Sequence, residues 1–193
     1  MLNVPNTLTL LRIALIPAFI VVYFLPFQYS SMVATAIFIL AGITDWLDGY
    51  LARRLGQYSP FGAFLDPVAD KLMVAAALVM LIADPRVHTL VYDNRLFGAV
   101  MVIIVGREIT ISALREWMAE VGKRSRVAVS FVGKFKTGSQ MLAIGFLIWR
   151  EPLWGMNIFK IGEWLLYVAA VLTLWSMISY LQAAWPNLTQ SEK

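Results

Sequence analysis

The chain has 193 residues, of which 60% are hydrophobic and only 15% are charged, and its mean hydropathy is +0.71. Soluble domains are about 25% charged and about 45–50% apolar, so this composition excludes an ordinary soluble domain. It predicts one integral membrane domain over residues 1–193. The absence of cysteine excludes disulfide bonds and thiolate chemistry. The net charge of +4 favours anionic lipids or phosphates as partners, and no nucleic acid is expected.

Six segments are apolar and long enough to cross a bilayer, which takes about 20 mostly apolar residues per helix. In chain order they are residues 7–26, 31–54, 61–83, 96–117, 133–149 and 156–184. Polar or proline-containing stretches separate them, among them residues 56–60, 84–85 and 150–152. The predicted fold class is therefore all-α, with six transmembrane helices.

The distribution of Lys and Arg predicts the orientation, because cytoplasmic loops carry an excess of both. With six spans, the two termini share one side of the membrane. That side also holds Arg53 and Arg54 and the basic connection between the fourth and fifth spans, whereas the connections on the other side hold only Arg86, Arg95 and Arg150. We therefore expect both termini in the cytoplasm.

Four aspartates interrupt the apolar pattern in the stretch DWLDGYLARRLGQYSPFGAFLDPVAD. At about 100° per residue, each half of this stretch gathers its aspartates on one helix face. The first face carries Asp45, Asp48, Gly49, Ala52 and Gly56, and the second carries Gly62, Asp66 and Asp70. Small residues on such a face let a second backbone or a ligand come close.

The two aspartate pairs are predicted to lie at similar depth, just inside the cytoplasmic boundary. Residues 31–44 and 72–83 carry no charge and correspond to about 21 Å and about 18 Å of helix. Unpaired carboxylates at this depth would repel one another, so Arg53, Lys71 or bound cations must lie among them. Oxygen ligands without His or Cys favour Mg²⁺, Mn²⁺ or Ca²⁺. The sequence therefore indicates a pocket open to one side, with the four aspartates around one ion or a close pair.

The aspartates would also suit two different roles, and the residues alone leave both open. A charged helical hairpin held by Asp–Arg pairs would not need Gly and Ala on the carboxylate face. An ion or proton pathway, as in a cation transporter, also places carboxylates inside a membrane. Such a pathway should continue with polar residues, and here both helices become wholly apolar beyond the aspartates.

The spacing of these residues resembles the signature of the CDP-alcohol phosphotransferases. The match runs Asp45-x2-Asp48-Gly49-x2-Ala52-Arg53-x8-Gly62-x3-Asp66-x3-Asp70. Further stretches are similar to the bacterial phosphatidylglycerophosphate synthases, namely PNTLTLLRI, GAFLDPVADK, REITISALREWMAEVGKRSRVAVSFVGKFKT and VLTLWSM. The resemblance covers nearly the whole chain. It implies six transmembrane helices, a homodimer and a location in the bacterial inner membrane among its lipids.

The resemblance also implies a reaction, in which CDP-diacylglycerol and sn-glycerol 3-phosphate give phosphatidylglycerophosphate and CMP at a cytoplasm-facing cavity. It implies two Mg²⁺ or Mn²⁺ ions on Asp45, Asp48 and Asp66, with Asp70 as general base and further metal ligand. The residues implied to bind CDP are Gly49, Ala52, Arg53 and Gly62.

Further candidates lie outside the signature. Asn6 and Thr9 are candidates for contacts with CDP, and a plain N-cap of the first helix is the alternative. Glycerol 3-phosphate is a dianion, so basic residues on the cytoplasmic side are candidates for binding it: Arg107, Arg115, Lys134 and Lys136. The alternative for each is a charge that sets topology or contacts lipid head groups. Inositol phosphate, serine or a second phosphatidyl lipid remain possible acceptors, and the basic residues favour a phosphorylated one.

Overall fold

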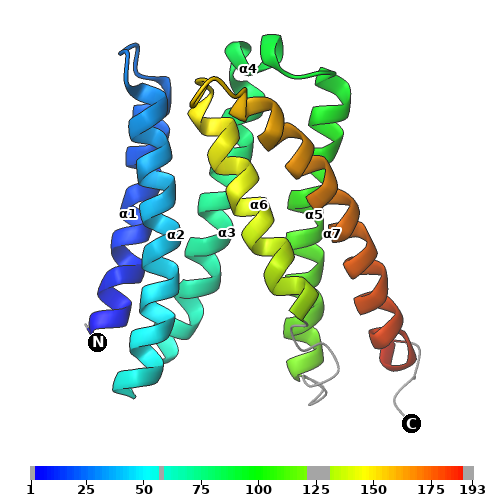
Figure 1. The fold of residues 1–193 in the computed structure, drawn as a ribbon. Coiled ribbons are helices and arrows are strands. Elements are labelled where there is room, and N and C mark those ends of the chain that lie inside the picture. The colour runs from blue at the N-terminus through cyan, green and yellow to red at the C-terminus, as the bar shows by residue number, and fades with distance from the viewer. Residues whose placement is uncertain (1–2, 57–58, 121–130, 189–193) are drawn as a thin grey trace.

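The computed structural model describes residues 3–56, 59–120 and 131–188, and the side chains of these residues except 131–137, 183 and 186–188. In this part of the chain all the regular elements are helices: α1 (Val4–Phe24), α2 (Ser30–Leu55), α3 (Pro60–Ala83), α4 (Pro85–Leu90), α5 (Asn94–Glu120), α6 (Phe131–Trp149) and α7 (Ile158–Leu188). The long helices run alternately up and down, as Figure 1 shows. The start of α1 and the end of α7 therefore lie at one end of the bundle, and α4 lies at the other.

The six long helices coincide with the six predicted segments to within a few residues, whereas the short helix α4 was not predicted. It begins directly after Asp84, whose carboxylate accepts a hydrogen bond from the Arg86 amide at 2.9 Å and so caps the helix. Pro85 occupies the first helical position, where the amide hydrogen that proline lacks would have no helical partner. The Asp84-Pro85 pair ends one helix, as predicted, and also starts another.

Four of the described helices are long and apolar enough to cross a membrane, namely α1, α2, α5 and the segment Ile158–Gln182 of α7. Helix α3 has 24 residues, but Asp66, Asp70 and Lys71 lie so centrally that every 18-residue stretch of it contains three charges. In α6 the apolar segment Gly138–Trp149 is described with its side chains and is shorter than a full span. Hydropathy alone therefore supports four spans.

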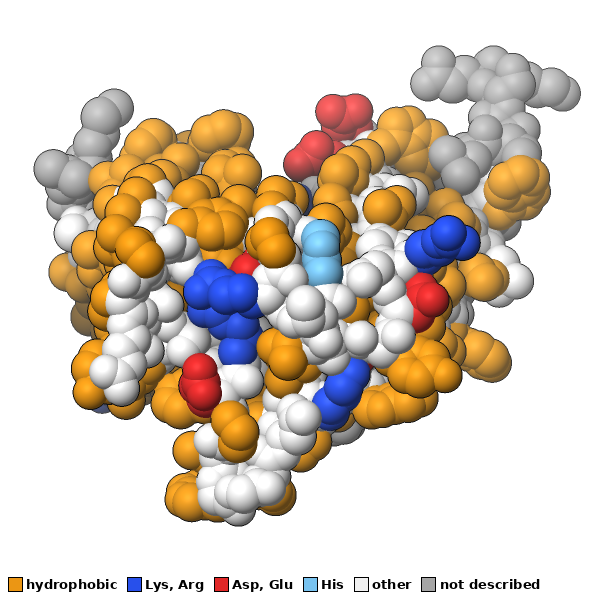
Figure 2. Space-filling model, turned by 90° about the horizontal axis from the view of Figure 1, so that it is seen from above, with side chains coloured by type: hydrophobic (Ala, Val, Ile, Leu, Met, Phe, Trp, Pro, Cys, Tyr) orange, Lys and Arg blue, Asp and Glu red, His pale blue; other side chains and the backbone are white. Residues whose placement is uncertain are grey.

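The outside of the bundle is largely apolar. Val102, Val171 and Trp175 are 70%, 67% and 75% exposed. Seen from the α4 end in Figure 2, charged side chains of both signs lie singly or in small groups among hydrophobic ones. Soluble monomers rarely expose large continuous apolar surfaces. The surface is therefore that of a membrane protein.

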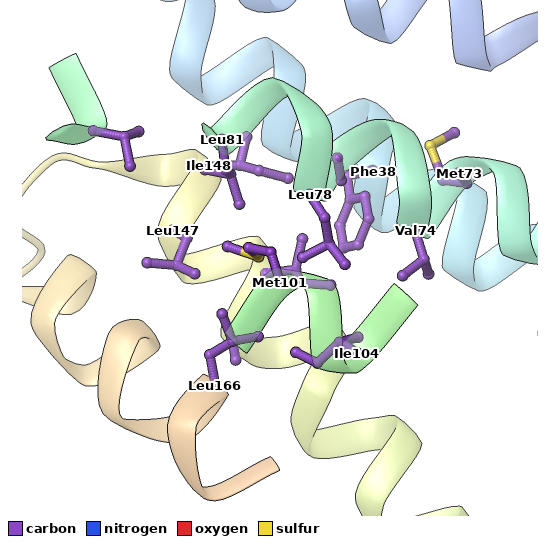
Figure 3. Packing of buried hydrophobic residues seen from close by; sticks show 14 of the residues in the cluster. Phe38, Met73, Val74, Leu78, Leu81, Met101, Ile104, Leu147, Ile148 and Leu166 are labelled. Atoms are coloured by element: carbon purple, nitrogen blue, oxygen red, sulfur yellow. The ribbon is translucent and has the colours of Figure 1, made fainter. Parts of the chain in front are cut away.

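The core lies where α2, α3, α5, α6 and α7 meet. Figure 3 shows side chains from all five helices converging there, among them Phe38, Leu78, Met101, Leu147 and Leu166. Each of these five side chains is at most 2% exposed. Lipid tails are as apolar as leucine, so close packing holds these helices together rather than the removal of their side chains from water.

Helix α1 packs against both α2 and α3, and its contact with each is more extensive than the contact between α2 and α3. Its close approach to α3 depends on Gly62, because a Cβ atom there would lie 2.5 Å from Asn6 Oδ1. Ser59 caps α3 by accepting a hydrogen bond from the Gly62 amide at 2.9 Å, and its hydroxyl donates to Asn6 Oδ1 at 3.0 Å. The N-cap of α1 is Asn3, so the N-cap alternative for Asn6 and Thr9 is wrong.

We predict that Gly62→Ala lowers the melting temperature, because the added methyl group pushes Asn6 and Ser59 away from α3. Such overpacking costs about 1–3 kcal/mol, which corresponds to roughly 3–10 °C for a chain of this size. Thermal unfolding of the purified protein in detergent measures the change. The matched control is Gly98→Ala in α5, where an added Cβ would have no neighbour within 4 Å. A Gly62→Ala protein as stable as the native one would contradict the packing argument.

At the α4 end, Asp84 joins three parts of the chain. It is 1% exposed, and its carboxylate accepts hydrogen bonds from Arg86 Nε at 2.9 Å and Arg150 Nη1 at 2.6 Å. Arg150 follows α6, and its guanidinium carbon lies 4.9 Å from the centre of the Tyr23 ring on α1. Burial opposes the ionisation of Asp84, but the hydrogen bonds from Arg86 outweigh it and hold the pKa of Asp84 below its usual value.

We predict that Asp84→Asn lowers the melting temperature at pH 7 by several degrees, because Arg150 then lacks its carboxylate partner. The pKa of Asp84 is lower in the folded than in the unfolded chain. Its ionisation therefore stabilises the fold above about pH 4, and this stabilisation is lost as the pH falls through the folded-state pKa. The difference in melting temperature between the native and Asp84→Asn proteins, measured from pH 7 to pH 3, should be constant at first and shrink below about pH 4. A difference that persists unchanged to pH 3 would count against the ion pairs of Asp84.

Candidate active site

The four aspartates of the signature lie in the same half of the bundle. They belong to the C-terminal half of α2 and the N-terminal half of α3, which Figure 1 shows at the end where α1 begins. Asp48 is 3% exposed, Asp66 and Asp70 are half-buried, and Asp45 is exposed. The two predicted pairs therefore lie near the same end of the molecule.

The positive charge among these aspartates comes from α1. Arg12 is 1% exposed, its Nη1 donates to Asp45 Oδ1 at 2.6 Å, and its Nη2 donates to Asp48 Oδ2. Of the two side chains considered from the sequence, Arg53 is exposed and Lys71 donates to Ser112 Oγ on α5, so neither takes the place of Arg12 beside Asp45 and Asp48. Arg12 is the one charged residue in the 21 residues of α1, and that isolation was the signal by which it could have been found.

Thr9 completes the contact between α1 and the aspartates. It is fully buried, and its hydroxyl lies 2.7 Å from Asp66 Oδ1 and 3.3 Å from Asp48 Oδ2. Thr9 and Arg12 are three residues apart and so share one face of α1. This face holds three carboxylates close together that would otherwise repel one another.

A cavity of about 770 Å³ adjoins the aspartates between α2 and α6. Arg12, Asp45 and Asp70 line one end of it. The rest of its wall is almost entirely apolar and extends along α2 to Met32, about 20 Å from Asp45 at the helical rise per residue. Other lining residues such as Ile39 are about half exposed, so the cavity opens on the outside of the bundle.

The residues that the resemblance assigns to CDP differ in their surroundings. The nearest atom to a Cβ added at Gly49 would be Arg53 Nη2 at 4.0 Å, so the surface around Gly49 is open. Ala52 is half-buried on the same face of α2. The space beside Gly62, by contrast, is filled by the side chain of Asn6. The packing of α1 against α3 therefore requires glycine at this position.

The basic residues of α5 are engaged within the protein. Arg107 is 9% exposed, and its Nη1 donates to Glu108 Oε1 at 2.6 Å. The guanidinium carbon of Arg115 lies 5.5 Å from the centre of the Tyr180 ring on α7. Lys134 and Lys136 lie on α6, but their side chains are outside the described residues. The structure thus describes two of the four residues proposed for the acceptor.

The aspartate cluster provides the type of ligands that hard divalent ions prefer, namely carboxylate oxygens. Among the side chains that the structure describes, no group of three or more His, Cys, Asp or Glu residues is arranged to hold a metal ion. Two of the carboxylates, those of Asp45 and Asp48, are paired with Arg12 instead. By the chemistry of their oxygens, the side chains that would hold a divalent ion are these two and Asp66, with Asp70 at the cavity wall.

Comparisons with known proteins agree with this site. The family described as CDP-alcohol phosphatidyltransferase matches residues 2–175. A CDP-diacylglycerol–glycerol-3-phosphate 3-phosphatidyltransferase of Salmonella typhimurium is 53% identical over 96% of this chain and 97% of its own length. Proteins of the same name from Haemophilus influenzae (52% identical over 96% of this chain and 95% of theirs) and Yersinia enterocolitica (53% over 98% of each) are also similar.

The match to the family extends well beyond the aspartate signature, since it includes α1 with Arg12 and most of α7. Proteins of this family generally depend on a divalent metal, which agrees with the all-oxygen ligands of the cluster. The resemblance inferred from the spacing of the aspartates is confirmed: the chain belongs to the CDP-alcohol phosphatidyltransferase family.

Proposed function

We propose that this protein transfers the phosphatidyl group of CDP-diacylglycerol to sn-glycerol 3-phosphate, giving phosphatidylglycerophosphate and CMP in phospholipid biosynthesis. The observation that carries the proposal is that the aspartate cluster opens into the apolar cavity between α2 and α6. A lipid donor with a diphosphate head needs a charged site and an apolar space side by side. Relatives that are 50–53% identical over 96% of this chain and carry the name of this activity support the choice of acceptor.

The proposed setting is the bacterial inner membrane, with six spans in one domain and both termini in the cytoplasm. Helix α3 suits a span despite its charges, because Asp66 contacts Thr9 and Lys71 contacts Ser112 inside the protein. Arg53 and Arg54 lie in the last turn of α2, at the end of the bundle where α1 begins, which favours the cytoplasm for that end. The cavity would then receive the head groups from the cytoplasmic side. The family resemblance supports a homodimer.

The donor is proposed to place one acyl chain in the cavity and its diphosphate at the end formed by Arg12, Asp45 and Asp70. The cytidine part would then lie over the open face of α2 at Gly49 and Ala52, where Arg53 can pair with a phosphate. The oxygens of Asn6 and Thr9 hold α3 and the aspartates in place. Contacts of these two residues with CDP stay a prediction.

In the proposed reaction, Asp70 takes the proton of the attacking hydroxyl of glycerol 3-phosphate. The hydroxyl oxygen forms a bond to the β-phosphorus of the donor, the bond from that phosphorus to the bridging oxygen breaks, and CMP leaves with the electron pair. When bound, two Mg²⁺ or Mn²⁺ ions on Asp45, Asp48, Asp66 and Asp70 would neutralise the phosphates and align the attacking and leaving oxygens. Thr9 keeps Asp48 of α2 and Asp66 of α3 close together for this purpose.

The acceptor phosphate is proposed to bind at Arg107 and Arg115, with Lys134 and Lys136 of α6 completing the site. The Nε atoms of both arginines are buried and have no hydrogen-bond partner among the described residues, so each can still donate one hydrogen bond. Charge-assisted bonds of this kind are stronger than neutral ones. They favour a phosphorylated acceptor over serine.

The reaction is tested by supplying the purified protein with CDP-diacylglycerol, Mg²⁺ or Mn²⁺ and one acceptor at a time, and by following the release of CMP. Release with glycerol 3-phosphate is expected, with phosphatidylglycerophosphate identified by mass spectrometry. If no acceptor releases CMP, the proposed activity is refuted. If inositol phosphate replaces glycerol 3-phosphate, the assignment of the acceptor is refuted.

We predict that Asp70→Asn lowers kcat by about 100- to 10,000-fold, the usual contribution of a general base. Binding of CDP, measured by calorimetry in the presence of Mn²⁺, should remain because Asp45, Asp48 and Asp66 are unchanged. Glu151→Gln is the control, since Glu151 is exposed after α6 at the opposite end of the bundle. An Asp70→Asn enzyme with more than about a tenth of native turnover would rule out the base assignment.

We predict that Gly145→Leu in the far part of the cavity selects against long acyl chains. Gly145 lines the cavity, and a Cβ there would have no neighbour within 4 Å, so leucine can extend into the space. With dipalmitoyl CDP-diacylglycerol, kcat/KM should fall by roughly tenfold or more, as expected when an occupied space is overfilled. With a dihexanoyl donor, kcat/KM should stay close to native.

The matched control for Gly145→Leu is Gly98→Leu, which adds the same side chain on α5 away from the cavity wall. It should affect both donors equally. Equal losses for long and short donors in Gly145→Leu would exclude the cavity as the place of an acyl chain.

A further inference from the structure

Arg12 pairs with two of the carboxylates that the proposed reaction assigns to divalent cations. We infer that Arg12 is an exchangeable counter-ion: its guanidinium competes with the divalent cation for Asp45 and Asp48, and once displaced it binds the diphosphate of the donor. This role goes beyond the proposed function, on which it rests for the identity of the donor.

The competition follows from the geometry of the guanidinium. Its two terminal nitrogens donate to one oxygen each, Asp45 Oδ1 at 2.6 Å and Asp48 Oδ2. A cation that used these same two oxygens would need the space between them, which the guanidinium fills. The two carboxylates therefore bind either the arginine or the cation through this pair of oxygens.

The charges in the cluster explain why both partners are needed. Asp48 and Arg12 are 3% and 1% exposed, and a buried carboxylate without a positive partner destabilises the fold. Arg12 removes this penalty as long as no cation is bound. Two divalent cations balance four aspartates completely, which leaves the guanidinium as an uncompensated positive charge that requires an anion of its own.

The donor can supply that anion at the place where Arg12 already lies. Arg12 lines the charged end of the cavity together with Asp45 and Asp70, and its Nε has no hydrogen-bond partner among the described residues. A guanidinium binds phosphate oxygens through paired N–H groups. Its side chain can turn toward the cavity while α1 stays in place, because Thr9 and Asn6 hold the helix to α3 independently.

This exchange makes the binding of cation and donor interdependent. The cation releases Arg12 for the diphosphate, and the diphosphate keeps Arg12 away from the carboxylates. By thermodynamic linkage, each ligand then raises the affinity of the other by the same factor. A neutral side chain at position 12 removes the competition and weakens this coupling.

The test compares Mn²⁺ binding to the purified native protein, Arg12→Gln and Arg12→Lys, measured by electron paramagnetic resonance with and without CDP. Without CDP, Arg12→Gln should bind Mn²⁺ roughly tenfold more tightly than the native protein, or better, since each factor of ten corresponds to about 1.4 kcal/mol. Arg12→Lys should also bind more tightly, because lysine keeps the charge but cannot pair with both carboxylates through a fork. CDP should raise the Mn²⁺ affinity of the native protein more than that of Arg12→Gln.

The control is Arg95→Gln, an exposed residue at the start of α5 and the opposite end of the bundle, which should bind Mn²⁺ like the native protein. If Arg12→Gln binds Mn²⁺ as the native protein does, or more weakly, the proposed competition between Arg12 and the cation is overturned. If CDP raises the Mn²⁺ affinity of the native protein and of Arg12→Gln by the same factor, the binding of the displaced Arg12 to the diphosphate is overturned.

Thermal unfolding shows whether Arg12→Gln has lost its fold or only the competition between residue 12 and the cation. In a chelator, Arg12→Gln should melt below the native protein, because Asp45 and Asp48 lack a counter-charge. Mn²⁺ should then raise its melting temperature by more than that of the native protein, and a smaller rise would also overturn the inference. These measurements need no turnover, so a failure of the proposed reaction would appear separately, as absent CMP release by the native protein.

Discussion

Carboxylates inside a membrane protein need a positive charge beside them, and the structure depends on how α1 meets this need. Arg12 binds Asp45 and Asp48, and Thr9 binds Asp66, so one face of α1 serves both α2 and α3. Helix α1 must therefore pack against both, and Gly62 lets it come close enough. In the sequence, the signature covers two helices, α2 and α3. In the structure, α1 is a third part of the site, because its side chains contact the aspartates of both.

This position of α1 leaves another side of α2 to face α6, where the cavity lies. Glycines on both helices, Gly42 and Gly145 among them, line it and keep it open. The charged cluster thus opens directly into an apolar space. At the opposite end of the bundle, Asp84 and Arg150 connect α1, α3 and the end of α6, so α6 is held to α1 and α3 on the side away from the aspartates.

The Asp–Arg pairs by themselves would suit a structural hairpin, which the residues alone left open. Two features do not follow from structural pairing. Asp70 lines the cavity wall together with Asp45, and the surface beside Gly49 is open although it borders the buried Asp48. A purely structural pair would need neither the open surface nor the cavity. An ion or proton pathway is not supported either, because the cavity beyond the aspartates is apolar. Membership of a family of transferases also argues against a cation transporter.

The long helices, the positions of the four aspartates on them and the family could be predicted from the sequence, because apolar length and helical spacing are properties of neighbouring residues. The charge that faces Asp45 and Asp48, the partner of Lys71 and the place of the cavity depend on how the helices pack against one another. Arg12 is 33 and 36 residues away from its two partners, and Arg150 is 66 residues away from Asp84. The periodicity of a single helix carries no information about such pairs, since they exist only after separate helices have packed together.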